Sequence, residues 1–112
     1  MLRRQFKLMF EIREVYKKCD FYSYDGCSTF VDVCERHFKV SKSIGYAYNS
    51  IMEVCYETGA LTREEIEAQD CTVLRDLSAK LKALKLVKSQ KSQKILVEVV
   101  REHFGLNPLG QL

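Results

Sequence analysis

The chain has little proline and little glycine: Pro108 stands alone, and there are five glycines among 112 residues. Turn-rich β architectures draw heavily on both residue types, so this scarcity favours helices. The five cysteines are odd in number and contain no CxxC pair, which argues against a disulfide framework. A zinc site from Cys27, Cys34 and His37 has poor ligand spacing. We therefore expect neither a metal nor a cofactor.

Long apolar runs and recognisable catalytic patterns are also missing. No stretch is long and apolar enough to span a bilayer, and the first residues, Met-Leu-Arg-Arg-Gln-Phe-Lys, do not resemble a secretion signal. There is no phosphate-binding glycine loop and no Ser/His/Asp or Cys/His arrangement. We expect a cytoplasmic protein with reduced thiols, without a membrane partner and without enzymatic activity.

What is present is an ordinary globular composition with helical periodicity. Apolar residues make up 46% and charged residues 29% of the chain, whose length suits one modest core. The fold class predicted is all-α, a small multi-helix domain over residues 1–105 followed by a loosely ordered tail at 106–112. Its first helix, 2–19, is expected to turn inward Phe6, Met9, Phe10, Arg13 and either Val15 or Tyr16.

Residues 29–55 predict a helix-turn-helix. The inward stripe of its first helix is Phe30, Val33, Cys34 and His37, and that of its second helix is Ile44, Tyr48, Ile51 and Cys55. Ser28 or Thr29 can cap the first helix and Ser41 the second. The turn between them contains Phe38 and Val40, which are large enough to fill the angle between two helices.

The opposite face of the second helix carries groups that suit DNA. We expect Lys42, Tyr46 and Asn49 nearest the base edges, with Gly45 allowing close approach. Phosphate contacts are expected from Lys39, Ser41 and Ser43. Any two-helix hairpin with a polar outer face has the same pattern, so the pattern alone leaves DNA binding open.

Charge is segregated although the net charge is only +3. Residues 53–70 are acidic, and we expect that surface to face away from DNA or toward a basic partner protein. Residues 77–97 carry no acidic side chain. The lysines expected to add non-specific attraction to DNA are Lys80, Lys82, Lys85, Lys88, Lys91 and Lys94.

Further signals mark helix ends in the second half. Gly59 suits a C-terminal cap, Thr62 with Glu65 forms a capping box, and Asp70 can cap the next helix. The apolar run from Ile95 to Phe104 predicts a last helix ended by Gly105, with a short β-ribbon within 84–100 as the alternative. Such an apolar element is often a dimer seam, so a homodimer is expected.

Residues 24–66 resemble the plasmid partition proteins of spirochaete plasmids. The resemblance is carried by Thr29-Phe30, the run Phe38-Lys-Val-Ser-Lys-Ser-Ile-Gly-Tyr-Ala-Tyr48, Ile51, and Glu57-Thr-Gly-Ala-Leu61. Asn49 departs from it, because an aliphatic residue is usual there. The resemblance implies DNA binding in the replication or segregation of a mobile element.

The function predicted is sequence-specific binding of double-stranded DNA by a homodimer, in partition, replication control or transcription regulation. The alternative is a helical adaptor or anti-repressor that binds another protein through the acidic 53–70 surface or the C-terminal apolar face. RNA binding through exposed tyrosines and lysines is a third hypothesis.

Overall fold

The structure, a computed structural model, describes residues 3–85 and 89–107, which form helices joined by turns and loops and contain no strand. Its elements are α1 (Arg3–Lys18), η1 (Phe21–Ser23), α2 (Phe30–Asp32) continued by η2 (Val33–His37), α3 (Lys42–Ile51) continued by η3 (Met52–Glu57), α4 (Arg63–Glu67), α5 (Cys71–Ala83) and α6 (Gln90–His103). The all-α prediction is confirmed. The β-ribbon alternative is wrong for the described part of 84–100, because Ser89 caps a helix that continues through the whole β-branched run.

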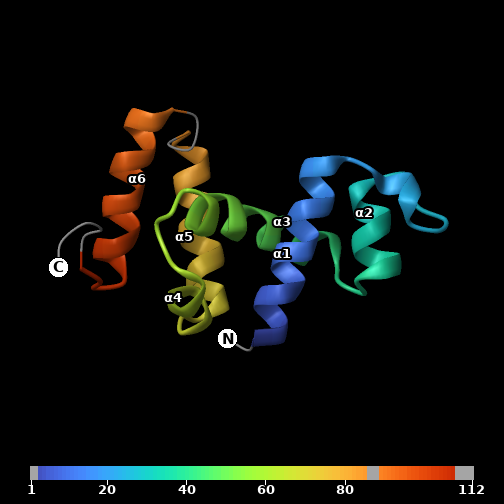
Figure 1. Cartoon of the computed structure of the whole chain (residues 1–112), viewed down its shortest axis with the longest axis horizontal. Coiled ribbons are helices and arrows are strands. Elements are labelled where there is room, and N and C mark those ends of the chain that lie inside the picture. Colours follow the sequence, from blue (N-terminus) through green and yellow to red (C-terminus); the bar gives the residue numbers. More distant parts are fainter. Residues whose placement is uncertain (1–2, 86–88, 108–112) are drawn as a thin grey trace.

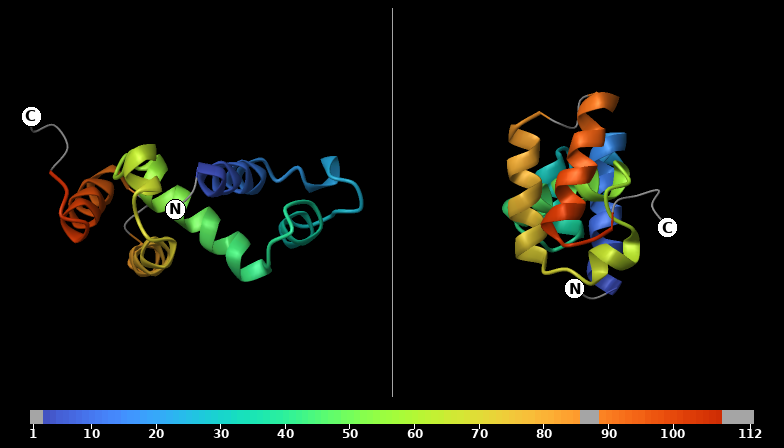
Figure 2. Two further views of the ribbon diagram at one scale, coloured as in Figure 1. Left: turned by 90° about the horizontal axis from the view of Figure 1, so that it is seen from below. Right: turned by 90° about the vertical axis from the view of Figure 1, so that its left-hand side faces the viewer.

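One long helical rod, α3 with η3, organises the molecule. It crosses the molecule, with α1 and α2 toward one end and α4, α5 and α6 toward the other (Figure 1; Figure 2). The molecule is accordingly elongated, with extents of 48 × 29 × 21 Å. Because α1 and α5 both pack on this rod, most of its circumference is covered and only a limited face is left for solvent.

The core is a single cluster of apolar side chains along the rod. From α3 and η3 it takes Tyr48, Ile51 and Cys55, as the periodicity predicts, while Ile44 is half-buried. Burying a large apolar side chain contributes about 1.5–3 kcal/mol, so this stripe fixes how the rod is rotated. The other helices contribute Phe6, Met9, Ile12, Val15, Phe30, Val33, Cys34, Leu74, Leu77, Leu81, Leu96 and Val100.

Two inward stripes differ from prediction. On α1 the third buried position is Ile12, while Phe10 and Tyr16 lie exposed and Arg13 forms ion pairs at the edge. Ile12 takes the buried position because burying an aliphatic side chain carries no cost in lost hydration of a polar group. A guanidinium must be paired when it leaves water, and Arg13 finds its carboxylate partners at the edge of the core. His37 is exposed and packs against the ring of Tyr24, with centroids 4.6 Å apart.

Predicted caps set the helix boundaries. Thr29 with Asp32 and Thr62 with Glu65 form reciprocal capping boxes, and Asp70 accepts hydrogen bonds from the N–H groups of Thr72 and Val73. Each such cap contributes about 1 kcal/mol. Gly59 has a φ of +79°, the left-handed conformation expected after a helix end.

The start of the expected tail is attached to the fold. Leu106 is half-buried, and its N–H donates to the carbonyl of Arg101 at 2.8 Å. The Arg101 guanidinium also donates to the carbonyl of Asn107. Residues 106 and 107 therefore belong to the domain, and the rest of the expected tail, 108–112, lies outside the described residues.

Candidate nucleic-acid interface

The N-terminal end of α3 is exposed and rich in polar groups. The Ser41 hydroxyl accepts a hydrogen bond from the N–H of Ile44 at 3.2 Å and so caps the helix. Lys39 precedes it in the left-handed region, with a φ of +59°. Lys39, Ser41, Lys42 and Ser43 are all exposed, as predicted.

A shallow groove of about 410 Å³ begins at this end and lies between α3 and α5. Its α3 wall is made by residues at spacing i, i+1, i+4, i+5 and i+8, which share one helix face. These residues are Lys42, Ser43, Tyr46, Ala47 and Ser50, and the α5 wall is made by Arg75 and Ala79. Two of the lining side chains are cations and none is a carboxylate, so the groove favours an anionic occupant.

Tyr46 lines the groove, and its ring is held in place by a neighbouring aromatic side chain. Its side chain is 41% exposed, and its ring lies against that of Phe30, with centroids 5.1 Å apart. Phe30 itself is buried and also meets the ring of Tyr16 edge-on at 5.1 Å. The phenol is thus presented from a fixed ring, which lowers the entropy that it would lose on binding.

Arg75 is the groove residue that the sequence reading missed. The basic surface predicted from the lysine series begins only at Lys80 and so leaves out Arg75. The usable signal was the inward stripe Leu74, Leu77 and Leu81, which places Arg75 and Ala79 together, one turn apart, on the adjoining face of α5.

Gly45 is a packing residue, and its predicted role in approaching DNA is wrong. It is buried, and a Cβ atom built on it would lie 2.5 Å from Cys34 Sγ and 3.2 Å from Cys34 Cβ. The absent side chain therefore allows α2 with η2 to approach α3. The prediction placed Gly45 on the side of α3 that faces DNA, whereas it lies on the side that packs against Phe30 and Cys34.

Asn49 is also not a surface residue, and its predicted contact with base edges is wrong. It is 1% exposed, and its Oδ1 accepts a hydrogen bond from the Arg13 guanidinium at 2.9 Å. Its Nδ2 is buried without a hydrogen-bond partner in the described structure. The reason is α1, which packs against α3, so that half-buried Ser50 rather than Asn49 continues the face that lines the groove.

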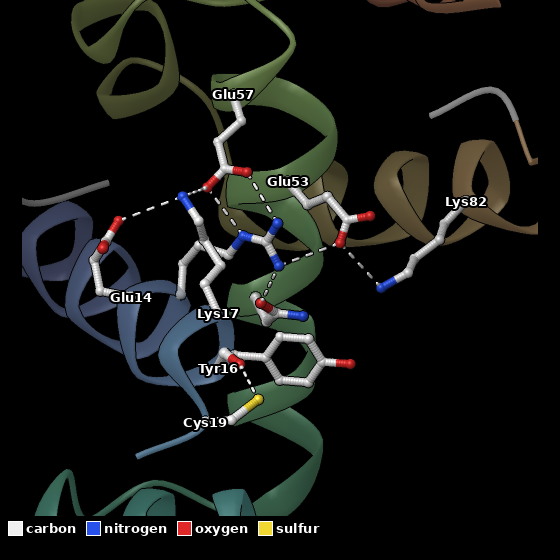
Figure 3. A network of polar contacts seen from close by, with 9 residues as sticks. Glu14, Tyr16, Lys17, Cys19, Glu53, Glu57 and Lys82 are labelled. Carbon is white, nitrogen blue, oxygen red and sulfur yellow. Dashed lines mark hydrogen bonds and ion pairs between the residues drawn. The ribbon is translucent and has the colours of Figure 1, made fainter. Parts of the chain in front are cut away.

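A polar network joins α1 to the rod, and Figure 3 shows Lys17 of α1 together with Glu53 and Glu57 of η3. The Arg13 guanidinium belongs to this network: it donates to both carboxylate oxygens of Glu57, at 3.0 and 2.9 Å, and lies 3.3 Å from Glu53. Burial lowers the pKa of Arg13, but Glu57 and Glu53 outweigh it and the pKa lies above its ordinary value. Lys17 adds a contact of 3.4 Å to Glu57 and one of 3.7 Å to Glu14.

The same network takes up one predicted DNA contact. The ammonium of Lys82 lies 3.5 Å from the Glu53 carboxylate, so it bridges α5 to η3 and lines no part of the groove (Figure 3). Lys80, Lys85, Lys91 and Lys94 are exposed but likewise do not line it, and Lys88 lies outside the described residues. The groove thus brings together Lys42, Ser43 and Tyr46 from the predicted set, and none of the lysine series.

The acidic segment 53–70 is largely neutralised from within the chain. Besides Glu53 and Glu57, Glu67 pairs with Arg63 at 2.9 Å. Both oxygens of Glu65 accept hydrogen bonds at 3.0 Å from Arg101, which is 7% exposed and also donates to the carbonyl of Ala60. The expected acidic docking surface is therefore reduced, because four of its carboxylates already hold cations.

Metal and thiol chemistry find little support in the described part of the chain. There, no three His, Cys, Asp or Glu side chains are placed to share a metal ion. All five cysteines are free thiols. Burial raises the pKa of Cys34 and of Cys55 to about 11, so both are protonated at neutral pH.

Comparison with protein-family models, curated proteins and solved structures gives no match for this chain. Among the described helices, none combines the length and the apolar character needed to cross a bilayer.

Proposed function

We propose that this chain binds double-stranded DNA, with α2 and α3 acting as a helix-turn-helix and the exposed stripe of α3 entering the major groove. The observation that carries the proposal is the groove in which Lys42 and Arg75 lie beside Tyr46 without any carboxylate in the lining. A helix fits the major groove, which is about 12 Å wide, and needs small or polar residues on the entering face. Ala47 and Ser50 meet that need.

The contacts sort into two kinds. Lys42, Tyr46 and Ser50 are proposed to reach base edges, where an ammonium, a phenol and a hydroxyl can each form hydrogen bonds. Lys39, Ser41 and Arg75 are proposed to contact phosphates on either side, with Ser43 at the margin. Two of the phosphate-contacting groups, Lys39 and Arg75, are cations, so log K should fall against log[salt] with a slope of roughly −2, at ~0.9 per phosphate.

The biological role proposed follows the resemblance of residues 24–66 to plasmid partition proteins. It is replication, segregation or transcription control of a mobile element, carried out in the cytoplasm by a homodimer that reads two half-sites. We do not propose that the chain catalyses a reaction on the nucleic acid.

The decisive experiment selects bound fragments from random duplex DNA and then measures the salt dependence of binding to the enriched site. For the Lys39→Ala, Arg75→Ala double variant we expect weaker binding and a slope reduced by roughly 1.8, since the two cationic phosphate contacts are lost. A control pair with the same charge change, Lys7→Ala and Lys91→Ala, lies outside the groove and should leave most of the slope intact.

Tyr46→Phe separates recognition from attraction. The ring packing on Phe30 is kept while the hydroxyl is lost, so preference among base sequences should change without a change in salt slope. No enrichment of any duplex, or equal loss in both charge pairs, would contradict the proposal. Preferential competition by single-stranded RNA would favour RNA binding in its place.

A further inference from the structure

A second concave surface lies away from the DNA groove. It is a cleft of about 490 Å³ between the C-terminal half of α1, the η1 segment and the end of η2. These segments lie toward the end of the molecule remote from α5 and α6 (Figure 1). Its lining residues are Phe10, Glu11, Glu14, Val15, Lys18, Asp20, Ser23, Tyr24, His37 and Phe38, none of which lines the groove between α3 and α5.

Aromatic rings form much of this cleft. Tyr24 lies against His37 at 4.6 Å and near Phe38 at 6.3 Å between ring centroids, and His37 meets Phe38 edge-on at 4.8 Å. Phe10, from α1, is 42% exposed, and Tyr24 and Phe38 are half-buried. A concave surface lined by partly exposed rings offers a flat partner group both apolar contact and stacking.

The charge of the cleft is opposite in sign to that of the groove. Three carboxylates, Glu11, Glu14 and Asp20, face a single ammonium, Lys18. Within the described chain Glu11 and Asp20 form no ion pair, whereas Glu14 lies 3.7 Å from Lys17. Carboxylates without cations repel phosphate and attract a cationic partner.

Two arginines within the chain show which cation can contact an aromatic ring and a carboxylate at the same time. The Arg63 guanidinium lies 4.7 Å from the centre of the Phe6 ring and pairs with Glu67. Arg13 lies 5.9 Å from the Tyr16 ring centre and pairs with Glu57. A planar guanidinium can stack on a ring and pair with a carboxylate through a fork of donors, which an ammonium cannot do equally well.

We propose that this cleft is a docking site for an arginine-bearing segment of a partner protein, held by Glu11 and Asp20 and stacked on the rings of Phe10 and Tyr24. The site is separate from the groove and does not rest on DNA binding. A chain bound to nucleic acid through α3 can therefore present the cleft to a protein at the same time.

The test uses the full chain and two acetylated, amidated pentapeptides, Gly-Arg-Gly-Arg-Gly and Gly-Lys-Gly-Lys-Gly, followed by ¹⁵N amide shifts at low salt. We expect saturable shifts from the arginine peptide confined to residues 10–24 and 37–38, and at least about threefold weaker binding of the lysine peptide.

Two sets of variants assign the binding to the cleft. Glu11→Gln with Asp20→Asn should weaken the arginine peptide at least about fivefold, since two exposed charge contacts are lost. The control pair Glu64→Gln with Glu102→Gln removes two exposed carboxylates outside the cleft and should change affinity by less than about twofold. Phe10→Leu keeps apolar bulk without a ring and should reduce the preference for arginine over lysine, because only the ring of Tyr24 is then left for stacking.

Shifts centred elsewhere, equal losses in the two carboxylate pairs, or no saturable binding would overturn the proposal. Self-association of the wild type that Glu11→Gln with Asp20→Asn abolishes would also overturn it, because the occupant would then be a second copy. Duplex affinity should be unchanged in that double variant. A chain that binds the peptide but no duplex refutes only the DNA proposal, and the reverse result refutes only the docking site.

Discussion

Replacing Gly45 by alanine tests whether this glycine exists for helix packing. The new Cβ would lie 2.5 Å from Cys34 Sγ, well inside van der Waals contact, and Cys34 is fully buried and has little room to move. Overpacking of this kind costs about 1–3 kcal/mol. Alanine in a helix is favoured over glycine by about 1 kcal/mol, so the net loss in the free energy of unfolding should be about 0–2 kcal/mol.

A double-mutant cycle separates the two effects. In a Cys34→Ala background the 2.5 Å contact with sulfur is gone and only the 3.2 Å contact with the Cβ atom remains, so Gly45→Ala should cost much less there than in the wild type, and helix propensity can offset the remainder by up to about 1 kcal/mol. The coupling energy, measured by urea unfolding, should be about 1–3 kcal/mol. As a matched control, Cys55→Ala removes another buried thiol that does not face Gly45, and the effect of Gly45→Ala should be unchanged there. Equal effects of Gly45→Ala in all three backgrounds would refute the packing role.

Two further predictions concern charge and thiols. Hydrogen bonds from Arg101 hold the pKa of Glu65 below its ordinary value, so this pair stabilises the fold above about pH 4.3 and the contribution is lost as pH falls through the folded pKa. Glu65→Gln keeps the capping box and should lower the free energy of unfolding by about 1–3 kcal/mol at pH 7, measured by chemical unfolding. This difference from the wild type should shrink below about pH 4, and a difference that does not depend on pH would contradict the ion-pair account. Exposed Cys19 should react first with a thiol reagent at neutral pH, whereas buried Cys34 and Cys55, with pKa values of about 11, should react only as the protein unfolds; fast labelling of either, read by mass spectrometry, would show that the core is open.

Much of the fold follows from local patterns. The cap at Thr29, one of two candidates, the capping box at Thr62, the cap at Asp70 and the left-handed Gly59 depend on residues a few positions apart, and each is found in the structure. The inward stripe Tyr48, Ile51 and Cys55 is equally local, since helical spacing puts these residues on one face. The helix 95–103 was harder, because a β-branched run has no period that separates helix from strand.

The candidate site depended on contacts between distant segments. Tyr46 and Asn49 are equally plausible surface residues along the sequence, yet α1 covers Asn49 and leaves Tyr46 41% exposed. Arg75 joins the groove only because α5 lies beside α3, and Lys82 leaves the predicted basic surface because Glu53 lies within 3.5 Å.

The sequence by itself determined several helix ends and the apolar face of α3, because caps and periodicity act over about one turn. Only the tertiary structure decided which polar residues remain exposed. A helix has more than one polar side, and a second helix packed against one of them, as α1 is on α3, buries residues that the periodicity cannot distinguish from their exposed neighbours.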